Sequence, residues 1–124
     1  MNAIHTEQAP AAIGPYSQAI EVNGFVYTSG QLPVDPATGE FAPGGIKEQT
    51  RQSLANVKNI LEQAGTSMNN VIKTTVFLND MNDFAAMNEV YAQFFQQPYP
   101  ARSAVAVEKL PKDALVEIEV VAAK

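Results

Sequence analysis

The sequence contains no cysteine, no tryptophan and a single histidine, His5, close to the N-terminus. Without cysteine the chain can form no disulfide, thiolate nucleophile or sulfur-ligated metal site. A serine–histidine triad or a multi-histidine metal centre would depend on His5 alone, and we interpret this residue as part of a first strand instead. The sequence therefore predicts no metal site and no covalent nucleophile.

Basic clusters and long apolar runs are also missing. The formal net charge is −5, so binding driven by phosphate neutralisation is disfavoured, and we expect neither nucleic acid nor an anionic membrane as a partner. No apolar run approaches membrane-spanning length, and no basic region followed by an apolar block begins the chain. These features predict a cytoplasmic protein.

The chain does contain enough apolar sequence for one globular domain. Hydrophobic residues make up 46% of the 124 residues and charged residues 17%, which is typical of a folded protein. A single domain of this size buries about two-thirds of its unfolded surface. With no internal repeat or linker, the sequence predicts one domain over residues 1–124.

The apolar periodicity predicts an α+β domain with the element order ββ(β)αβαββ. Asn23-Gly24 is the strongest short hairpin signal, because both central residues must tolerate positive φ. Gly65 marks the end of the first helix, and Asn82 is a plausible N-cap for the second. The expected strands cover 3–7, 17–22, 25–29, 71–78, 102–107 and 115–122, and the expected helices cover 46–64 and 83–95.

Two helices are too few to cover both sides of a six-stranded sheet. If both crossovers are right-handed and run the same way, both helices lie on one face. The other face then carries residues such as Phe77 and Val121 and is partly apolar. Because an exposed patch of that size usually marks an interface, we expect an obligate homo-oligomer.

Arg102 is one of only two arginines, and it lies in the segment PARS (100–103) just before a strand-like run. A guanidinium at the mouth of a strand suits two-point capture of a carboxylate. An ordinary cross-strand ion pair is an equally good interpretation. The other arginine, Arg51, lies on the polar face of the first helix.

Polar groups at the hairpin could bind a ligand. Tyr16 offers a hydroxyl on an apolar ring, Gly30 permits close approach of backbone N–H groups, and Ser29 adds a hydroxyl without an evident base. A strand-start aromatic and simple turn chemistry would explain these residues about as well.

The last strand carries two carboxylates, Glu117 and Glu119, which alternate with apolar residues and so share one sheet face. Partial burial of one would raise its pKa and make it a candidate for moving a proton to or from water. A solvated face is the alternative. On the second helix, Asn88 interrupts an apolar stripe, either to bridge a backbone group or to order a site loop.

Several motifs, taken in order, carry a resemblance that covers nearly the whole chain. They are AAIGPYS (11–17), YTSGQLP (27–33), QSLANV (52–57), VFL (76–78), NDF (82–84), PARS (100–103), LPKD (110–113) and VEIE (116–119). With them the chain resembles the Rid/YjgF family and, within it, the RidA subgroup of reactive-intermediate deaminases. The resemblance implies a chorismate-mutase-like α+β fold, assembled as a homotrimer with three inter-subunit clefts.

The resemblance also implies a reaction without metal or cofactor. Members hydrolyse enamines and imines, such as 2-aminoacrylate/2-iminopropanoate and 2-iminobutanoate, to 2-oxo acids and ammonia. By motif match, Arg102 holds the substrate carboxylate and Glu117 positions the attacking water. Tyr16 shapes the pocket and the Ser29-Gly30 segment makes polar contacts.

Two further positions follow from the same match. Asn88 corresponds to a recurrent family position. Many relatives have cysteine where this chain has Ala104, so a thiol-based activity is in doubt, while the backbone N–H at Ala104 stays available to a ligand. The stretch QQPY (96–99) looks shorter than in close relatives, which could alter the cleft rim.

Two other functions compete with deamination. A non-catalytic sensor of 2-oxo acids, or a protein-binding regulator, could use the same cleft. Retention of both Arg102 and Glu117 favours the enzyme, because sensing a carboxylate needs only the arginine. Ribonuclease activity has been attached to some family members, but the acidic balance of this chain counts against it.

Overall fold

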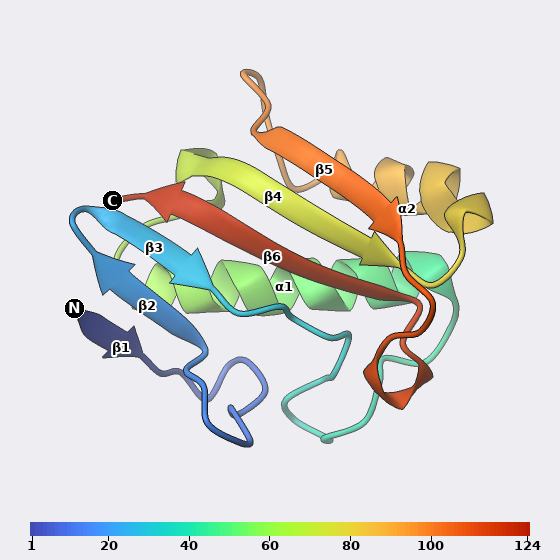
Figure 1. Ribbon diagram of the computed structural model, residues 1–124, viewed down its shortest axis with the longest axis horizontal. Helices are drawn as coiled ribbons and strands as arrows, with labels where there is room; N and C mark the ends of the chain where they lie inside the picture. The colour runs from blue at the N-terminus through green and yellow to red at the C-terminus, as the bar shows by residue number, and fades with distance from the viewer.

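A computed structural model describes residues 1–124 as a six-stranded sheet with two α-helices on one face (Figure 1). This confirms the expected α+β class, with six strands and two main helices. The strands are β1 (Asn2–Ile4), β2 (Ala19–Val22), β3 (Phe25–Thr28), β4 (Val71–Leu78), β5 (Ala101–Ala106) and β6 (Val116–Ala123); the helices are α1 (Ile46–Gln63) and α2 (Phe84–Tyr91), with short 3₁₀ turns η1 (Met68–Asn70), η2 (Met81–Asp83) and η3 (Pro111–Asp113).

The strands follow the order β1-β2-β3-β6-β4-β5 across the sheet. β4 and β5 are parallel and are joined by the α2 crossover, whereas all other neighbouring pairs are antiparallel. The last strand of the chain, β6, therefore lies between β3 and β4 in the middle of the sheet. β5 is an edge strand, so its far side is free to meet another molecule.

The hairpin between β2 and β3 forms at the position that the sequence predicts. Asn23 and Gly24 have φ values of 51° and 80°, as a two-residue turn with matching twist requires. Val22 pairs with Phe25 across this turn, and Ala19 pairs with Thr28 at its open end. The tight turn thus sets the register that brings residues 16–18 and 29–31 together.

The core lies between the sheet and α1. On β6 the buried residues alternate with half-buried ones, and Val116, Ile118 and Val120 all face the helices. From α1, Leu54 and Ile60 are fully buried against them. This alternation determines which side chains of β6 are left for the opposite face, and Glu117 is one of them.

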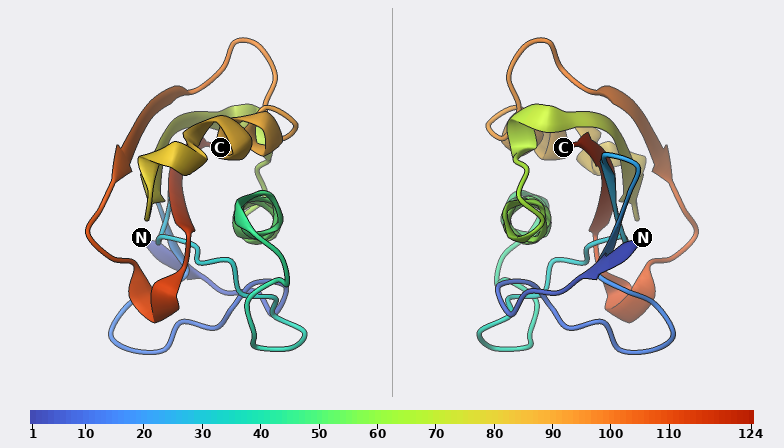
Figure 2. Two further views of the ribbon diagram at one scale, coloured as in Figure 1. Left: turned by 90° about the vertical axis from the view of Figure 1, so that its right-hand side faces the viewer. Right: turned by 90° about the vertical axis from the view of Figure 1, so that its left-hand side faces the viewer.

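The opposite face of the sheet has no helix over it, as the end-on views of Figure 2 show. Tyr27 and Val105 on this face are 47% and 44% exposed. Phe77 and Val121, the two residues named from the sequence, are half-buried. The expectation of a partly apolar, uncovered face is therefore confirmed.

Three local predictions need correction. The first strand is shorter and lies earlier than 3–7. The second helix ends at Tyr91 rather than Phe95, because the backbone after it tightens into turns: the Gln93 N–H donates to the Val90 carbonyl and the Phe94 N–H to the Tyr91 carbonyl, each over 3.0 Å and each three residues back. Phe95 still stacks on Tyr91, with ring centroids 4.6 Å apart, so the apolar pattern outlasts the helix.

The cap of that second helix also differs from the prediction. Asn82 is not its N-cap: the Asn82 backbone N–H donates to Asp80 Oδ1 over 2.9 Å, and the short turn η2 precedes the helix. No helix in the structure combines the length and the apolar character that crossing a membrane requires.

Candidate functional site

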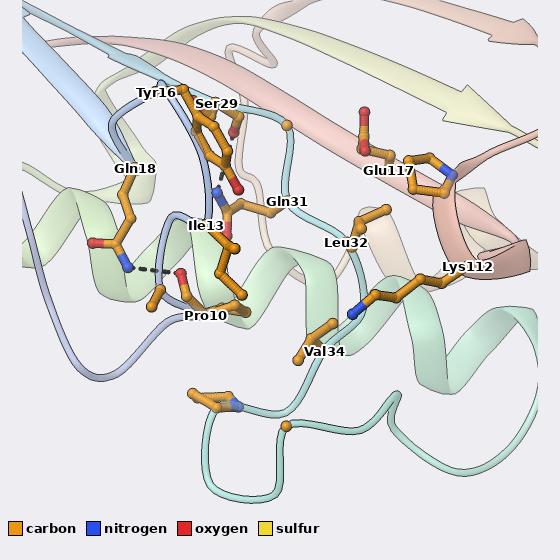
Figure 3. A pocket seen from close by; sticks show the side chains of 15 residues that line it. Pro10, Ile13, Tyr16, Gln18, Ser29, Gln31, Leu32, Val34, Lys112 and Glu117 are labelled. Atoms are coloured by element: carbon orange, nitrogen blue, oxygen red, sulfur yellow. Dashed lines mark hydrogen bonds between the residues drawn. The ribbon is translucent and has the colours of Figure 1, made fainter.

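Most of the polar residues singled out in the sequence line one of two surface hollows. The larger, the Glu117 hollow, has a volume of about 750 Å³ and contains Tyr16, Ser29, Gly30 and Glu117 (Figure 3). The smaller, the Arg102 hollow, has a volume of about 460 Å³ and is lined by Asn88, Tyr91, Ala92, Tyr99, Pro100 and Arg102. Part of the long loop after β3, including Leu32 and Val34, also lines the larger hollow.

Glu117 is the one acidic side chain in the larger hollow. It is half-buried and forms no salt bridge or hydrogen bond. Burial raises the pKa of the Glu117 carboxyl above its ordinary value, and the charge of Glu119 on the same face raises it further. An unpaired carboxyl with a raised pKa suits the transfer of a proton to or from water.

Gly30 lies directly against this carboxyl group. A Cβ atom on residue 30 would come within 2.7 Å of Glu117 Oε1 and 2.8 Å of its Cδ. At such a distance one of the two groups must move, so glycine at residue 30 is what allows the Glu117 carboxyl group to lie where it does. The close approach comes from the neighbouring residues: Gln31 and Ile118 form an antiparallel bridge, with the Gln31 N–H donating to the Ile118 carbonyl over 2.8 Å.

Ser29 serves first as a structural group in this hollow. Its hydroxyl donates to the Ser17 carbonyl over 2.6 Å, and its backbone N–H donates to the Gln18 carbonyl over 2.9 Å. The hydroxyl oxygen can still accept a hydrogen bond from a ligand. Tyr16, by contrast, is 53% exposed at the rim, where its ring is free to contact a bound molecule.

Gln18 contributes to this hollow although the sequence did not single it out. Its Oε1 accepts from the Thr6 N–H over 2.8 Å, and its Nε2 donates to the carbonyls of Thr6, Ala9 and Pro10. The residue is 2% exposed. A buried amide with four such contacts holds the N-terminal loop in place as one wall of the hollow. A lone glutamine at the start of an apolar strand was the available signal.

Arg102 lies on the other side of the sheet, next to α2. Its Nη1 donates to Asn88 Oδ1 over 2.7 Å. Its guanidinium carbon is 4.7 Å from the centre of the Tyr91 ring and 5.4 Å from that of Phe84. Stacking and hydrogen bonding together fix the plane of the guanidinium group, as carboxylate recognition requires.

No carboxylate of the chain pairs with Arg102. The salt bridges join Lys47 to Glu89, Lys109 to Asp113 and Lys124 to Glu21. The interpretation of Arg102 as a cross-strand ion pair is therefore wrong. The bridging role considered for Asn88 is also corrected, because its amide contacts the Arg102 side chain rather than a backbone group.

Tyr91 and Ala104 complete the surroundings of Arg102. The Tyr91 hydroxyl shares a hydrogen bond of 2.8 Å with Thr74, and burial raises the pKa of this phenol. Ala104 lines neither hollow, and its side chain packs against the core. It lies two residues after Arg102 on the same face of β5.

Arg102 and Glu117 lie on opposite faces of the same sheet. Arg102 pairs with Thr74, whose side chain is fully buried toward the helices. Glu117 pairs with Phe77 on the uncovered face. Within one chain, therefore, a three- or four-carbon acid cannot contact both groups at once. The structure brings together Tyr16, Ser29, Gly30 and Glu117 in one hollow, and Asn88 with Arg102 in the other.

Comparison with known proteins gives consistent matches over the whole chain. The family model described as Endoribonuclease L-PSP matches residues 6–124. A RutC family protein of Pyrococcus horikoshii is 61% identical over 121 residues, which is 98% of this chain and 96% of that protein. A goat (Capra hircus) protein named 2-iminobutanoate/2-iminopropanoate deaminase is 54% identical over 119 residues, 96% of this chain and 87% of its own.

Solved structures agree with these matches. The crystal structure of Escherichia coli TdcF with bound serine superposes with a TM-score of 0.95 at 49% identity, covering 100% of this chain and 99% of that one. The E. coli YjgF gene product superposes equally well, with a TM-score of 0.95 at 48% identity and the same coverage of both chains. The sequence matches and the shared fold thus show that the chain belongs to the endoribonuclease L-PSP family, the YjgF family that its motifs resemble.

Proposed function

We propose that this protein hydrolyses short 2-imino acids and their enamine tautomers, such as 2-iminopropanoate and 2-iminobutanoate, to 2-oxo acids and ammonia. The observation that carries the proposal is that two charged side chains of the chain have no ion-pair partner. The guanidinium group of Arg102 is held in place but pairs with no carboxylate, and the half-buried carboxyl group of Glu117 pairs with no cation. The first suits the substrate carboxylate and the second suits the attacking water.

In the reaction, Arg102 binds the carboxylate and holds the imine carbon near a water molecule on Glu117. The carboxylate of Glu117 accepts a proton from this water as its oxygen bonds to the carbon, and the C=N bond becomes a C–N single bond. Glu117 passes this proton to the nitrogen, which gives a carbinolamine. Glu117 then accepts the proton of the new hydroxyl group and delivers it to the same nitrogen, so that the C=O bond forms as the C–N bond breaks and ammonia leaves. An imine is already electrophilic, so orientation and one proton relay supply the catalysis.

The active site in this proposal is shared by two copies of the chain. Because Arg102 and Glu117 face opposite sides of one sheet, one copy supplies Arg102 with Asn88, and its neighbour supplies Glu117 with Gly30. The uncovered apolar face, with Tyr27 and Val105 exposed, provides the contact surface. Head-to-tail contacts of this kind close into a ring, and a ring of three copies is the homotrimer with three equivalent clefts that the family resemblance implies.

The names of relatives support the same chemistry. The goat relative is named a 2-iminobutanoate/2-iminopropanoate deaminase. The TdcF structure contains serine, an amino acid whose carboxylate is the group that we assign to Arg102. The family description mentions an endoribonuclease, but a net charge of −5 and the absence of a basic stripe do not favour RNA as a substrate.

Subunit complementation tests both the residues and the shared site. We expect Arg102→Ala and Glu117→Gln each to abolish release of ammonia from enzymatically generated 2-aminoacrylate. When the two variants are unfolded, mixed in equal amounts and refolded, random trimers have an intact cleft at about a quarter of positions, because each cleft takes its two residues from different copies. The mixture should therefore recover about a quarter of wild-type activity.

Each alternative predicts a different result. If both residues served one site within one chain, the mixture would remain inactive. If Arg102→Ala alone released ammonia at the wild-type rate, the carboxylate-binding role would be wrong. Absence of ammonia release from several imino acids, together with binding of 2-oxo acids, would favour a sensor. RNA cleavage that survives stringent purification and is lost with either substitution would favour a nuclease.

A further inference from the structure

The Glu117 hollow holds a second charged side chain, Lys112, that the proposed hydrolysis does not use. Among the residues lining this hollow, only Lys112 and Glu117 carry a formal charge. Lys112 forms no salt bridge or hydrogen bond, whereas its neighbour Lys109 pairs with Asp113 over 3.3 Å. An unpaired ammonium group on the wall of a ligand-sized hollow is available to an anion.

The backbone at Lys112 is in a conformation that side chains rarely adopt. Its φ and ψ are 57° and 25°, and Asp113 follows with φ of 60°. Glycine would adopt this left-handed conformation without steric cost. A lysine held in such a turn at the wall of a hollow indicates that its side chain has a use there.

The ammonium group of Lys112 also points away from Glu117. In Figure 3 the Lys112 side chain extends along the hollow toward Leu32 and Val34, while the Glu117 carboxyl group is directed to the opposite side. The two charges therefore serve different parts of the hollow. Its volume of about 750 Å³ falls in the range of sites for drug-sized ligands.

We propose that Lys112 forms a second anion subsite, which binds the distal carboxylate of an acidic 2-imino acid or 2-oxo acid. This inference rests on the proposed function: Arg102 of the neighbouring copy holds the carboxylate next to the imine carbon, and Glu117 holds the water. The chain beyond that carbon then runs along the hollow toward Lys112. The subsite extends the substrate class to dicarboxylic imino acids and adds no chemical step.

Equilibrium binding of two five-carbon ligands tests the subsite. 2-Oxoglutarate and 2-oxopentanoate differ at the far end of the chain, where only the first has a carboxylate. We expect the wild-type protein to bind 2-oxoglutarate more tightly in calorimetry. Lys112→Gln should reduce the ratio of the two affinities by about threefold or more, as loss of one partly exposed ion pair does. Lys112→Arg should retain most of the ratio.

Two further variants control for charge and for folding. Lys109→Gln removes the same charge three residues earlier, outside the hollow, and it should retain the wild-type ratio. Lys112→Gly relieves the left-handed conformation, so its melting temperature should equal or exceed that of the wild type while the ratio falls. A loss of selectivity in this variant cannot come from misfolding.

Several results would overturn the subsite. They are equal wild-type affinity for the two ligands, a ratio that Lys112→Gln and Lys112→Gly leave intact, or an equal loss in Lys109→Gln. A wild-type protein that binds neither ligand also overturns it. The proposed function is judged separately, by ammonia release from 2-iminobutanoate. If ammonia is released but the protein does not prefer 2-oxoglutarate to 2-oxopentanoate, only the Lys112 subsite is wrong. If no ammonia is released, the proposed function is wrong.

Discussion

Arg102 Nη1 donates a hydrogen bond to Asn88 Oδ1 over 2.7 Å, and this contact links the edge strand β5 to the helix α2. The two residues are 14 positions apart in the sequence. The amide uses one N–H of the guanidinium group and leaves others free for a ligand. Asn88 is therefore a positioning residue for Arg102 in the proposed site.

Removal of this amide should weaken ligand binding more than turnover. In Asn88→Ala, Arg102 retains its charge and its aromatic neighbours but loses one orienting contact, so we expect KM to rise by about fivefold with a smaller change in kcat. Asn88→Asp should raise KM further, because a carboxylate would pair with the guanidinium. Glu89→Gln on the same helix, which faces Lys47 instead, is the control. An equal loss in Glu89→Gln would contradict the positioning role.

Replacement of Arg102 by lysine should show that the planar group matters and not only the charge. Lysine retains the positive charge but cannot form two parallel hydrogen bonds to a carboxylate. We expect Arg102→Lys to raise the dissociation constant for 2-oxobutyrate by about tenfold, measured by calorimetry. Arg51→Lys, at the other arginine, lies exposed on α1 and should behave as the wild type. Unchanged binding in Arg102→Lys would contradict this prediction, because it would show that positive charge alone is enough to bind the carboxylate.

An added methyl group at Gly30 should impair catalysis but only slightly affect folding. The new Cβ would lie 2.7 Å from Glu117 Oε1, so the flexible Glu117 side chain must turn aside. Displacement of a catalytic group by about 1 Å can reduce turnover by about a hundredfold. We therefore expect Gly30→Ala to lower kcat strongly and to shift the urea midpoint little. Gly45→Ala, with nothing within 4 Å of its added Cβ, is the matched control.

The raised pKa of Glu117 predicts an unusual dependence of stability on pH. A carboxyl group whose pKa is higher in the folded state binds its proton more tightly there than in the unfolded chain. Its contribution therefore favours folding below the ordinary value of 4.5, and that advantage is lost as the pH rises through the raised folded pKa. Glu117→Gln should be more stable than the wild type at neutral pH and no more stable at pH 4.

Urea unfolding of both proteins at several pH values measures this difference. An advantage of Glu117→Gln that grows as the pH falls would contradict the direction of the shift. The same group predicts the pH profile of activity. Because the ionised carboxylate is the proton acceptor in the proposed mechanism, kcat should increase with pH through the raised pKa of Glu117.

Loss of the buried Gln18 amide should destabilise the fold and disturb the Glu117 hollow. Gln18→Leu would leave the Thr6 N–H and three backbone carbonyls without their partner. We expect a loss of about 3 kcal/mol in the free energy of unfolding, measured in urea. Gln8→Leu makes the same chemical change at an exposed side chain that forms no hydrogen bond. If Gln8→Leu lowered the free energy of unfolding as much as Gln18→Leu, the loss could not be attributed to the hydrogen bonds of Gln18.

Local signals in the sequence determined most elements of the fold. The Asn23-Gly24 dipeptide specified the hairpin through its positive φ values, and the alternation around Glu117 specified which side chains of β6 avoid the core. The apolar stripe that Asn88 interrupts is buried in the structure at Tyr91 and Phe95, but the helix ends before the stripe does. An apolar stripe predicts which residues are buried but not where the helix stops, and Phe95 is buried four residues after the helix has ended.

The site depended on information that is not local. The sequence by itself identified Arg102 and the pair Glu117 and Glu119 as candidate charged groups, and the resemblance of its motifs to a family selected Glu117 from that pair. Only the tertiary structure decided that Arg102 and Glu117 face opposite sides of the sheet, since that depends on how β4 pairs with both β5 and β6. Gln18, Lys112 and Gly30 likewise line the Glu117 hollow because segments far apart in the sequence lie side by side there. The apolar periodicity of one segment does not indicate which other segment it will contact.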